Sequence, residues 1–183
     1  MQSRHGQRRV PPAGSATACP NGFTLIELMV TVAVVAILAV VAMPNLLSVI
    51  NNNRLASQTN ELITSLQMAR SEAVRLNTPV TVCRSTNGTS CAAAGSWDRW
   101  ITLAGAQVLR DTSARPPVQI TSGVAAITYR SDGLARDATG ALLVNTITVC
   151  VPTGQPLQNQ RLMNMTAGGR IETVPASGAG ACP

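Results

Sequence analysis

Glu27 is the residue of this sequence whose chemistry most needs an explanation. It is a carboxylate near the start of an almost purely apolar stretch, NGFTLIELMVTVAVVAILAVVAMPNLL, residues 21–47. A charge inside an apolar segment of membrane length is costly and usually has a partner. Pro44, near the other end of the stretch, removes one backbone donor and should bend or loosen a helix there. The stretch therefore predicts a paired role for Glu27 and a helix kink at Pro44.

The rest of the sequence contains no recognisable catalytic or metal-binding set. All 14 basic residues are arginine, which excludes lysine Schiff-base and P-loop chemistry. The one histidine, His5, lies before the apolar stretch, so a serine or cysteine nucleophile in the later domain has no histidine base. Five cysteines occur, but none in a C-x-x-C spacing. We therefore predict no enzymatic activity, no metal and no cofactor.

Three aspartates and two tryptophans have simple structural interpretations. Asp111, Asp132 and Asp137 lie in or beside predicted turns, where aspartate commonly caps the backbone. Trp97 and Trp100 could form a stacking platform for a ligand. Two tryptophans that flank the start of a strand more often pack in a core or at an edge, and we favour that interpretation.

The apolar segment from residue 23 to 43 is long enough to cross a membrane. As a helix it would span about 30 Å, the thickness of a bilayer core. A cleaved secretory signal fits less well, because its apolar region is shorter and no A-x-A site follows here. Arg4, Arg8 and Arg9 precede the segment and would hold the N-terminus in the cytoplasm. From residue 23 onward 11 arginines oppose 8 acids, so the remaining excess of +3 does not indicate nucleic-acid binding.

A helical pattern continues from Pro44 to Asn77, where it becomes amphipathic. The apolar stripe consists of Leu55, Thr59, Leu62, Leu66, Ala69, Ala73 and Leu76. The polar residues that lie mostly off the stripe are Arg54, Gln58, Glu61, Ser65 and Glu72. The helix should end at LNTP, because the residue before Pro79 disfavours the α region. Residues 23–77 are thus expected to form one helix of about 80 Å.

From Pro79 the pattern changes to short strands separated by turn signals. The predicted strands are residues 80–84, 98–104, 118–122, 126–130, 142–151, 161–166 and 169–174. The sequence therefore predicts an α+β fold, in which an antiparallel sheet from residues 78–183 packs against the amphipathic helix half, residues 44–77. The final stretch, PASGAGACP, should be flexible unless it is tied down.

The string GFTLIELMV resembles the processing site of type IV pilins and type II secretion pseudopilins. The resemblance implies a type IV pilin fold and a leader peptide, residues 1–22, which prepilin peptidase removes by cutting after Gly22. It also implies that the new first residue, Phe23, is N-methylated. Glu27 would then pair with the N-terminal ammonium of a neighbouring subunit during assembly, which gives a carboxylate in lipid its partner.

Motifs in the rest of the chain resemble the GspH/FimT branch of minor pilins and pseudopilins. They are ARSEAVRLNTPVTVCRS, WDRWI, ITYRSDG and GGRI, and the resemblance is strongest before residue 85. Loss of Cys19 with the leader leaves four cysteines in a domain that would be periplasmic or extracellular, where disulfides persist. We favour the pairs Cys83–Cys91 and Cys150–Cys182, worth about 2.5 and 3.5 kcal/mol by loop entropy. Other pairings stay open, because sequence does not determine connectivity.

Some members of the FimT branch resemble receptors for DNA uptake, in which a G-R-x-R motif contacts phosphates. The GRIE of this sequence matches the first arginine at Arg170, but Glu172 takes the position of the second and would repel a phosphate backbone. Arg161 and Arg170 could still form a small basic DNA-binding patch with Arg130 or Arg136. The simpler interpretation is that these arginines are solvated charges on an exposed sheet face.

The resemblance implies a minor type IV pilin that primes pilus assembly as the preferred function. The alternatives are a DNA-binding minor pilin for natural transformation and a minor pseudopilin of a type II secretion system. The expected partners are other pilin subunits, prepilin peptidase and the inner membrane, with DNA as a partner in the first alternative. The protein is expected to be a single-pass inner-membrane protein with its C-terminal domain in the periplasm, and to enter a pilus or pseudopilus on assembly.

Overall fold

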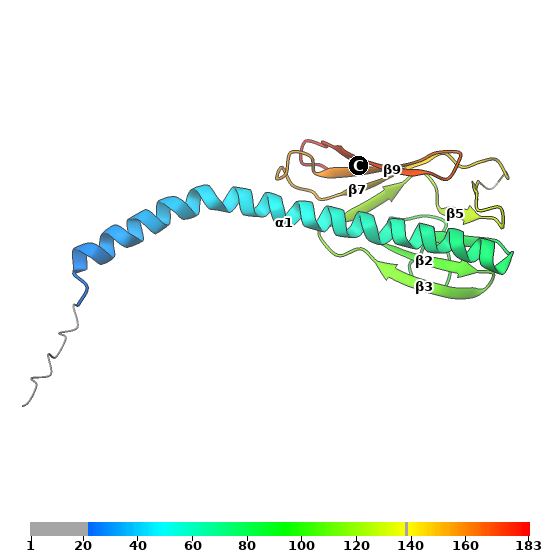
Figure 1. Cartoon of the computed structure of the whole chain (residues 1–183), viewed down its shortest axis with the longest axis horizontal. Helices are drawn as coiled ribbons and strands as arrows, with labels where there is room; N and C mark the ends of the chain where they lie inside the picture. Colours follow the sequence, from blue (N-terminus) through cyan, green and yellow to red (C-terminus); the bar gives the residue numbers. More distant parts are fainter. Residues whose placement is uncertain (1–21, 138) are drawn as a thin grey trace, which may run out of the picture. The chain divides into compact units, whose positions relative to one another are not determined.

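The computed structural model describes residues 22–137 and 139–183. These residues belong to two compact units, one that ends at Ala39 and one that begins at Val40. The first unit contains the start of helix α1, and the second contains the rest of α1 and the strands β1 to β9. Figure 1 shows these elements coloured along the chain.

Helix α1 spans Leu25–Leu76. The Thr24 hydroxyl caps its first turn by accepting a hydrogen bond of 3.2 Å from the backbone N–H of Glu27. At the other end Asn77 adopts a positive φ of 52° and Pro79 follows, so the helix stops at LNTP. The helix predicted for residues 23–77 is therefore confirmed to within two residues at either end.

Judged by length and hydropathy, no single helix among the described residues qualifies as a membrane span. A bent pair made of Leu25–Val40 and Asn45–Leu76 does qualify, by length and composition only. The break between these two pieces includes Pro44, and the kink expected there stays a prediction.

The amphipathic part of α1 buries the stripe that its spacing predicts. The buried members are Leu55, Thr59, Leu62, Leu66, Ala69 and Ala73. Leu76 is 37% exposed, so the buried stripe ends one turn earlier than predicted. Gln58 and Ser65, expected mostly off the stripe, are buried as well. Their polar groups are satisfied by residues distant in sequence, because Ser65 accepts from Trp100 and Gln58 accepts from the backbone of Arg115.

The strands form two antiparallel sheets, so the expectation of a single sheet is wrong. The first sheet has the order β3-β2-β1-β5-β6, with β1 at Val80–Arg84, β2 at Arg99–Ala104, β3 at Gln107–Ser113, β5 at Ala126–Tyr129 and β6 at Ala135–Arg136. The second has the order β4-β7-β8-β9, with β4 at Gln119–Ser122, β7 at Asn145–Cys150, β8 at Gln160–Met165 and β9 at Ile171–Ala176. Strand periodicity predicts where strands lie but not which strands pair, and β3 and β6 were not predicted at all.

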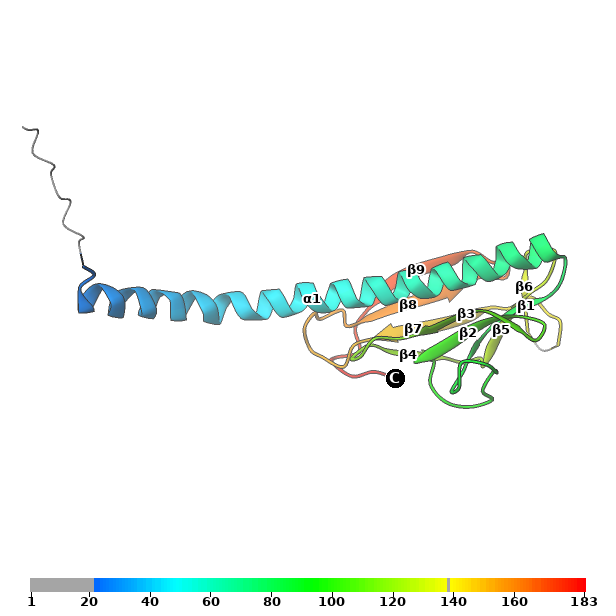
Figure 2. The same ribbon diagram turned by 90° about the horizontal axis from the view of Figure 1, so that it is seen from below.

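The helix lies against both sheets. Figure 1 shows β2 and β3 along one side of α1 and β7 and β9 along the other, and Figure 2 shows most of the strands beneath it. Apolar side chains from α1 and from both sheets meet in one core. The helix therefore closes the junction between the two sheets, as an α+β arrangement requires.

Trp97 and Trp100 belong to this core. Their side chains are 0% and 1% exposed, and the indole N–H of Trp97 donates a 2.9 Å hydrogen bond to the carbonyl of Val124. The packing interpretation of the two tryptophans is confirmed. A stacking platform for a ligand is wrong, because both rings are covered.

Candidate functional site

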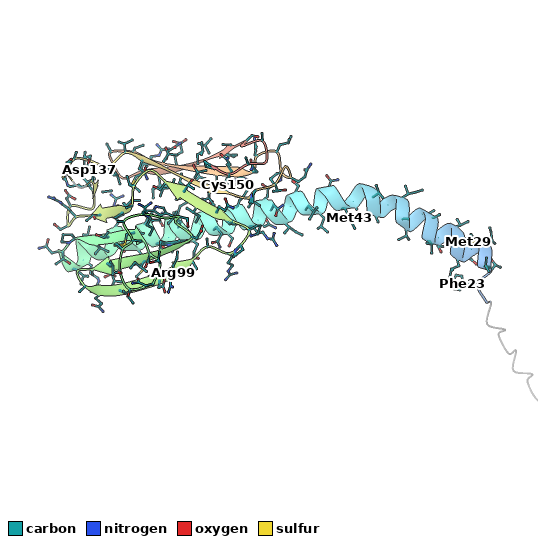
Figure 3. The ribbon with its side chains drawn as sticks, turned by 180° about the vertical axis from the view of Figure 1, so that it is seen from behind. Phe23, Met29, Met43, Arg99, Asp137 and Cys150 are labelled. Carbon is teal, nitrogen blue, oxygen red and sulfur yellow. A yellow bond between two sulfur atoms is a disulfide. The ribbon has the colours of Figure 1, made fainter. Side chains whose placement is uncertain are left out.

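An apolar surface covers the beginning of α1. Every large apolar side chain whose exposure is described between Phe23 and Ile50 is accessible, from 38% for Ile50 to 82% for Phe23. Figure 3 shows side chains as sticks along this part of the chain, with Phe23 labelled just before α1 and Met29 labelled on it. A contiguous apolar surface of this extent marks a contact with lipid or with other protein chains.

Glu27 lies in the first turn of this apolar helix. Its backbone N–H is bound to Thr24, and the two residues have the spacing of a capping box. Within residues 22–137 and 139–183, however, no hydrogen bond or ion pair involves the Glu27 carboxylate. The capping role therefore uses only the backbone at this position, and the carboxylate is available to a group outside this part of the chain.

Gly22, at the predicted cut, lies just before α1 in a stretch without regular structure. A Cβ atom built on Gly22 would meet nothing within 4 Å, so the backbone is open on this side. A peptidase requires such accessible backbone at its cleavage site. The rest of the predicted leader, including Cys19, His5 and the arginines that precede the apolar segment, lies outside the described residues.

One disulfide joins Cys83 to Cys91, with a Cα–Cα distance of 5.5 Å, as favoured from the sequence. It closes a short loop after β1. The Arg84 guanidinium fastens the same loop, because it donates to the backbone carbonyls of Ala92 at 3.2 Å and Gly95 at 2.9 Å. The loop is thus held by a covalent bond and by a side chain that satisfies its carbonyls.

The second disulfide joins Cys150 to Cys182, with a Cα–Cα distance of 5.7 Å, and is also the favoured pair. Asn159, fully buried, binds the same tail: its amide donates to Ala181 at 3.1 Å and its carbonyl accepts from Gly178 at 2.8 Å. The C-terminal tail is therefore tied down. Asn159 carries no sequence signal for this role, because its partners are brought to it only by the fold.

Two of the three aspartates cap turns, as predicted. Asp132 accepts from the backbone N–H of Leu134 at 2.9 Å, and Asp137 accepts from that of Thr139 at 2.8 Å. Asp111 differs, because it lies within β3, the strand that was not predicted.

Ion pairs restrain several of the arginines. Arg99 on β2 pairs with Asp111 on β3, and Arg136 pairs with Asp132 at 2.7 Å. Hydrogen bonds from these guanidiniums hold the pKa of each carboxyl below its ordinary value. No group of three or more histidine, cysteine or acidic side chains that could hold a metal ion is found in the described part of the chain.

The structure does not bring Arg161 and Arg170 together. Arg161 lies at the start of β8 opposite Pro175, whereas Arg170 follows the turn beyond the last pair of the hairpin, Met165 and Ile171. Because Arg170 lies opposite Thr166, the two arginines are separated by roughly 17 Å along the strand. Antiparallel pairing thus places them at opposite ends of the same hairpin, and a DNA-binding patch that contains both stays a prediction.

Arg70 on α1 is a surface residue that the sequence did not single out. A Cβ atom built on Gly133 would lie 3.4 Å from its Nε, and one built on Gly169 would lie 3.6 Å from its Nη1. Arg70, Tyr129 and Arg170 also line a pocket of about 230 Å³. The turns at Gly133 and Gly169 could be predicted from the sequence. Their approach to Arg70 depends on the tertiary structure and could not.

Two sequence families match the chain. The family described as Type II transport protein GspH matches residues 58–169, more than half of the chain. The prokaryotic N-terminal methylation motif matches residues 19–43, which include Gly22, Phe23 and Glu27. No curated protein matches the chain in sequence.

Solved structures of minor pilins and pseudopilins resemble this one. The type IV minor pilin FimU of Pseudomonas aeruginosa is 22% identical, with a TM-score of 0.51 over 66% of this chain and 93% of that one. A second crystal form of FimU is 21% identical, with a TM-score of 0.52 over 68% of this chain and 90% of that one. The minor pseudopilin EpsH of Vibrio cholerae is 12% identical, with a TM-score of 0.49 over 67% of this chain and 97% of that one.

The likeness to FimU extends over nearly all of that protein and confirms the predicted pilin fold. The family match spans the C-terminal third of α1 and most of the sheets, and the methylation motif covers the apolar start of the helix. This chain therefore belongs to the GspH family and is a minor pilin or pseudopilin of the kind that builds type IV pili and type II secretion systems.

Proposed function

We propose that this protein is a minor type IV pilin, a structural subunit that primes pilus assembly and performs no catalysis. The observation that carries the proposal is the apolar surface from Phe23 to Ile50, which holds an acid with no partner among the described residues. Lipid covers such a surface before assembly, and the helices of neighbouring subunits cover it in a filament. The methylation motif over residues 19–43 supports the same proposal.

In this proposal prepilin peptidase removes residues 1–22 and leaves Phe23 as the methylated N-terminus. Residues 23–43 anchor the subunit in the inner membrane, residues 44–77 carry the domain, and residues 78–183 lie in the periplasm. The new ammonium of one subunit meets Glu27 of its neighbour. Because an unpaired charge in lipid is costly, this contact favours only the axial register in which the pair forms.

Substitution of Glu27 by alanine tests the registration role. The Glu27→Ala variant keeps the backbone N–H that binds Thr24, so we expect it to insert in the membrane and to lose its leader. We expect it to be absent from sheared filaments, because the pairing contact is gone. Immunoblots of membrane and filament fractions measure both properties. Glu172→Ala, which removes an exposed acid of β9, is the matched control, and normal incorporation of Glu27→Ala would refute the registration role.

Substitution of Gly22 tests the cleavage site. We expect Gly22→Ser to retain residues 1–22, because the peptidase must accommodate the backbone at a residue without a side chain. The retained leader would appear as a slower band on a denaturing gel and as a larger intact mass. A variant trimmed like the wild type would contradict the proposed cut while leaving the anchor in place.

A minor pseudopilin of type II secretion is the second candidate, and the description of the matched family favours it. Both functions use the same anchor and the same cut. A deletion strain separates them: loss of surface pili with normal protein export indicates the pilus. Loss of exported proteins with intact pili indicates secretion.

DNA uptake does not form part of the proposal. Arg161 donates to Asn52 of α1 at 2.9 Å, away from Arg170, and Glu172 follows Arg170 by two positions. A DNA gel-shift tests this function. Binding that weakens steeply with salt and that Arg170→Ala abolishes would support a role in DNA uptake.

A further inference from the structure

A pocket opens at the end of the domain where α1 enters it. It has a volume of about 480 Å³ and lies between α1 and the segment that joins β3 to β4. Ile50 and Val118 contribute apolar wall, while Arg54 and Arg115 contribute two exposed cationic side chains. An apolar wall beside two guanidinium groups suits a ligand that is itself part anion and part hydrocarbon.

Within the described residues no acid lines this pocket, and the two acids that line the adjoining cavity with Arg115, Glu61 and Asp111, are already paired with Arg110 and Arg99. None of the ion pairs found among residues 22–137 and 139–183 involves Arg54 or Arg115. The Arg54 side chain donates at 3.3 Å to the neutral amide of Asn51. Glu61, the nearest acid along α1, is already paired with Arg110. The pocket therefore presents two positive charges that remain available to an anion.

The uncharged stretch of α1 continues up to the pocket. Residues 28–53 carry no charge, so no charged side chain of the helix lies between the end of the proposed anchor, residue 43, and Arg54. Arg54 is the first charged residue after this stretch, and helical side chains lean toward the N-terminus, here toward the membrane. Ile50 continues the exposed apolar surface up to the pocket.

A loop at the same end of the domain has the same character. The loop between β7 and β8 is fastened to α1, because the Asn51 amide donates to the carbonyl of Gln155 at 2.9 Å. Leu157 in this loop is 79% exposed, and Arg161 at its end donates to Asn52. An exposed leucine and an arginine four residues later are a combination suited to the boundary of a bilayer.

We propose that this pocket binds the phosphate headgroup of an anionic phospholipid. Arg54 and Arg115 contact the phosphate, and Ile50 contacts the glycerol backbone next to it. The inference rests on the proposed membrane anchor, because the anchor is what brings the pocket to the lipid surface. Its consequence is that the domain is held at the bilayer until the helix leaves the membrane for a filament.

The test uses the full chain in bilayer discs of phosphatidylcholine and phosphatidylglycerol in equal parts. Native mass spectrometry of the released protein identifies the lipids that remain bound. The wild type should retain phosphatidylglycerol in preference, and R54Q/R115Q should reduce that preference by on the order of tenfold. R130Q/R170Q, which removes two exposed arginines outside the pocket, should keep the wild-type preference.

When the chain is present in the discs, four results would overturn the proposal. They are a wild type without preference for phosphatidylglycerol, equal losses in the two double variants, displacement of the lipid by millimolar glycerol phosphate, and displacement by a short DNA duplex. The last two would identify a soluble phosphate or a nucleic acid as the ligand. A chain missing from the disc fraction would refute the anchor and this inference with it, whereas a chain present in the discs without lipid preference would refute this inference alone.

Discussion

At the residue scale, Trp100 ties the first sheet to the helix through one buried hydrogen bond. Its indole N–H donates to the hydroxyl of Ser65 at 2.9 Å. Trp100→Phe removes the donor but keeps an aromatic ring, so we expect the free energy of unfolding to fall by about 1–3 kcal/mol in urea denaturation. Ser65→Ala removes the other partner, and the double variant should lose little more than either single one. Fully additive losses would contradict this coupling.

Tyr129 makes the stability of the domain depend on pH in the alkaline range. Burial of its phenol raises its pKa to about 12, against an opposing effect of Arg70. The pKa of an unfolded tyrosine is about 10, so the folded state keeps a proton that the unfolded state loses. The stabilisation is complete below pH 10 and falls by roughly 2 kcal/mol as the pH approaches 12.

Urea unfolding at a series of pH values measures this loss. Tyr129→Phe has no proton to lose, so its stability should be flatter than that of the wild type between pH 10 and 12. The same slope in both proteins would assign the effect to other groups.

At this scale the sequence predicts correctly which side chains of α1 are buried when their burial depends only on their own polarity and spacing. Leu62 and Ala69 follow the helical period and are buried as expected. Gln58 and Ser65 are buried because each bonds a group far along the chain, and periodicity contains no information about such partners. The same reason explains why the buried Asn159 was not foreseen.

At the scale of elements, the ends of α1 are marked by local sequence signals, whereas the pairing of the strands is not. Thr24 and the LNTP string are local signals, and the helix begins and ends beside them. Strand β3 was not predicted, because its residues are partly exposed on both faces and show little alternation of apolar and polar side chains. The division into two sheets depends on pairings such as β4 with β7, which only the assembled fold determines.

The disulfide to the tail should stabilise the domain more than the disulfide after β1. The separation of its cysteines is 32 residues against 8, so it restricts the unfolded chain more strongly. We expect serine substitution of Cys150 and Cys182 to cost about 3.5 kcal/mol, and of Cys83 and Cys91 about 2.5 kcal/mol. Urea unfolding of the two double variants measures the difference. A larger loss for the shorter loop would contradict the entropic explanation.

At the scale of the whole molecule, the proposed anchor can be tested by one charge near its middle. Val35 is 63% exposed on α1. An arginine at the centre of a membrane helix costs about 2.5–3.5 kcal/mol, so we expect Val35→Arg to insert poorly. Carbonate extraction of membranes measures insertion. Val174→Arg on β9, 39% exposed, is the matched control, and full insertion of Val35→Arg would contradict the anchor.

The methylation motif of this protein was predictable from a short string, whereas the pocket between α1 and the segment from β3 to β4 was not. GFTLIELMV is local, and the methylation motif matches the same region. Arg54 and Arg115 lie far apart in the sequence and share a pocket only because the segment between β3 and β4 returns to α1. Sites of this kind depend on tertiary contacts and have no sequence pattern of their own.

The bond between Cys150 and Cys182 also determines how the domain responds to force. Cys182 is the penultimate residue, and Cys150 ends β7, an inner strand of the second sheet. A load applied at Pro183 therefore passes directly to β7, and the 32-residue separation between the cysteines cannot be pulled out. Fully extended, that length of chain measures about 110 Å, so the oxidised domain should stretch less than the reduced domain by about this amount.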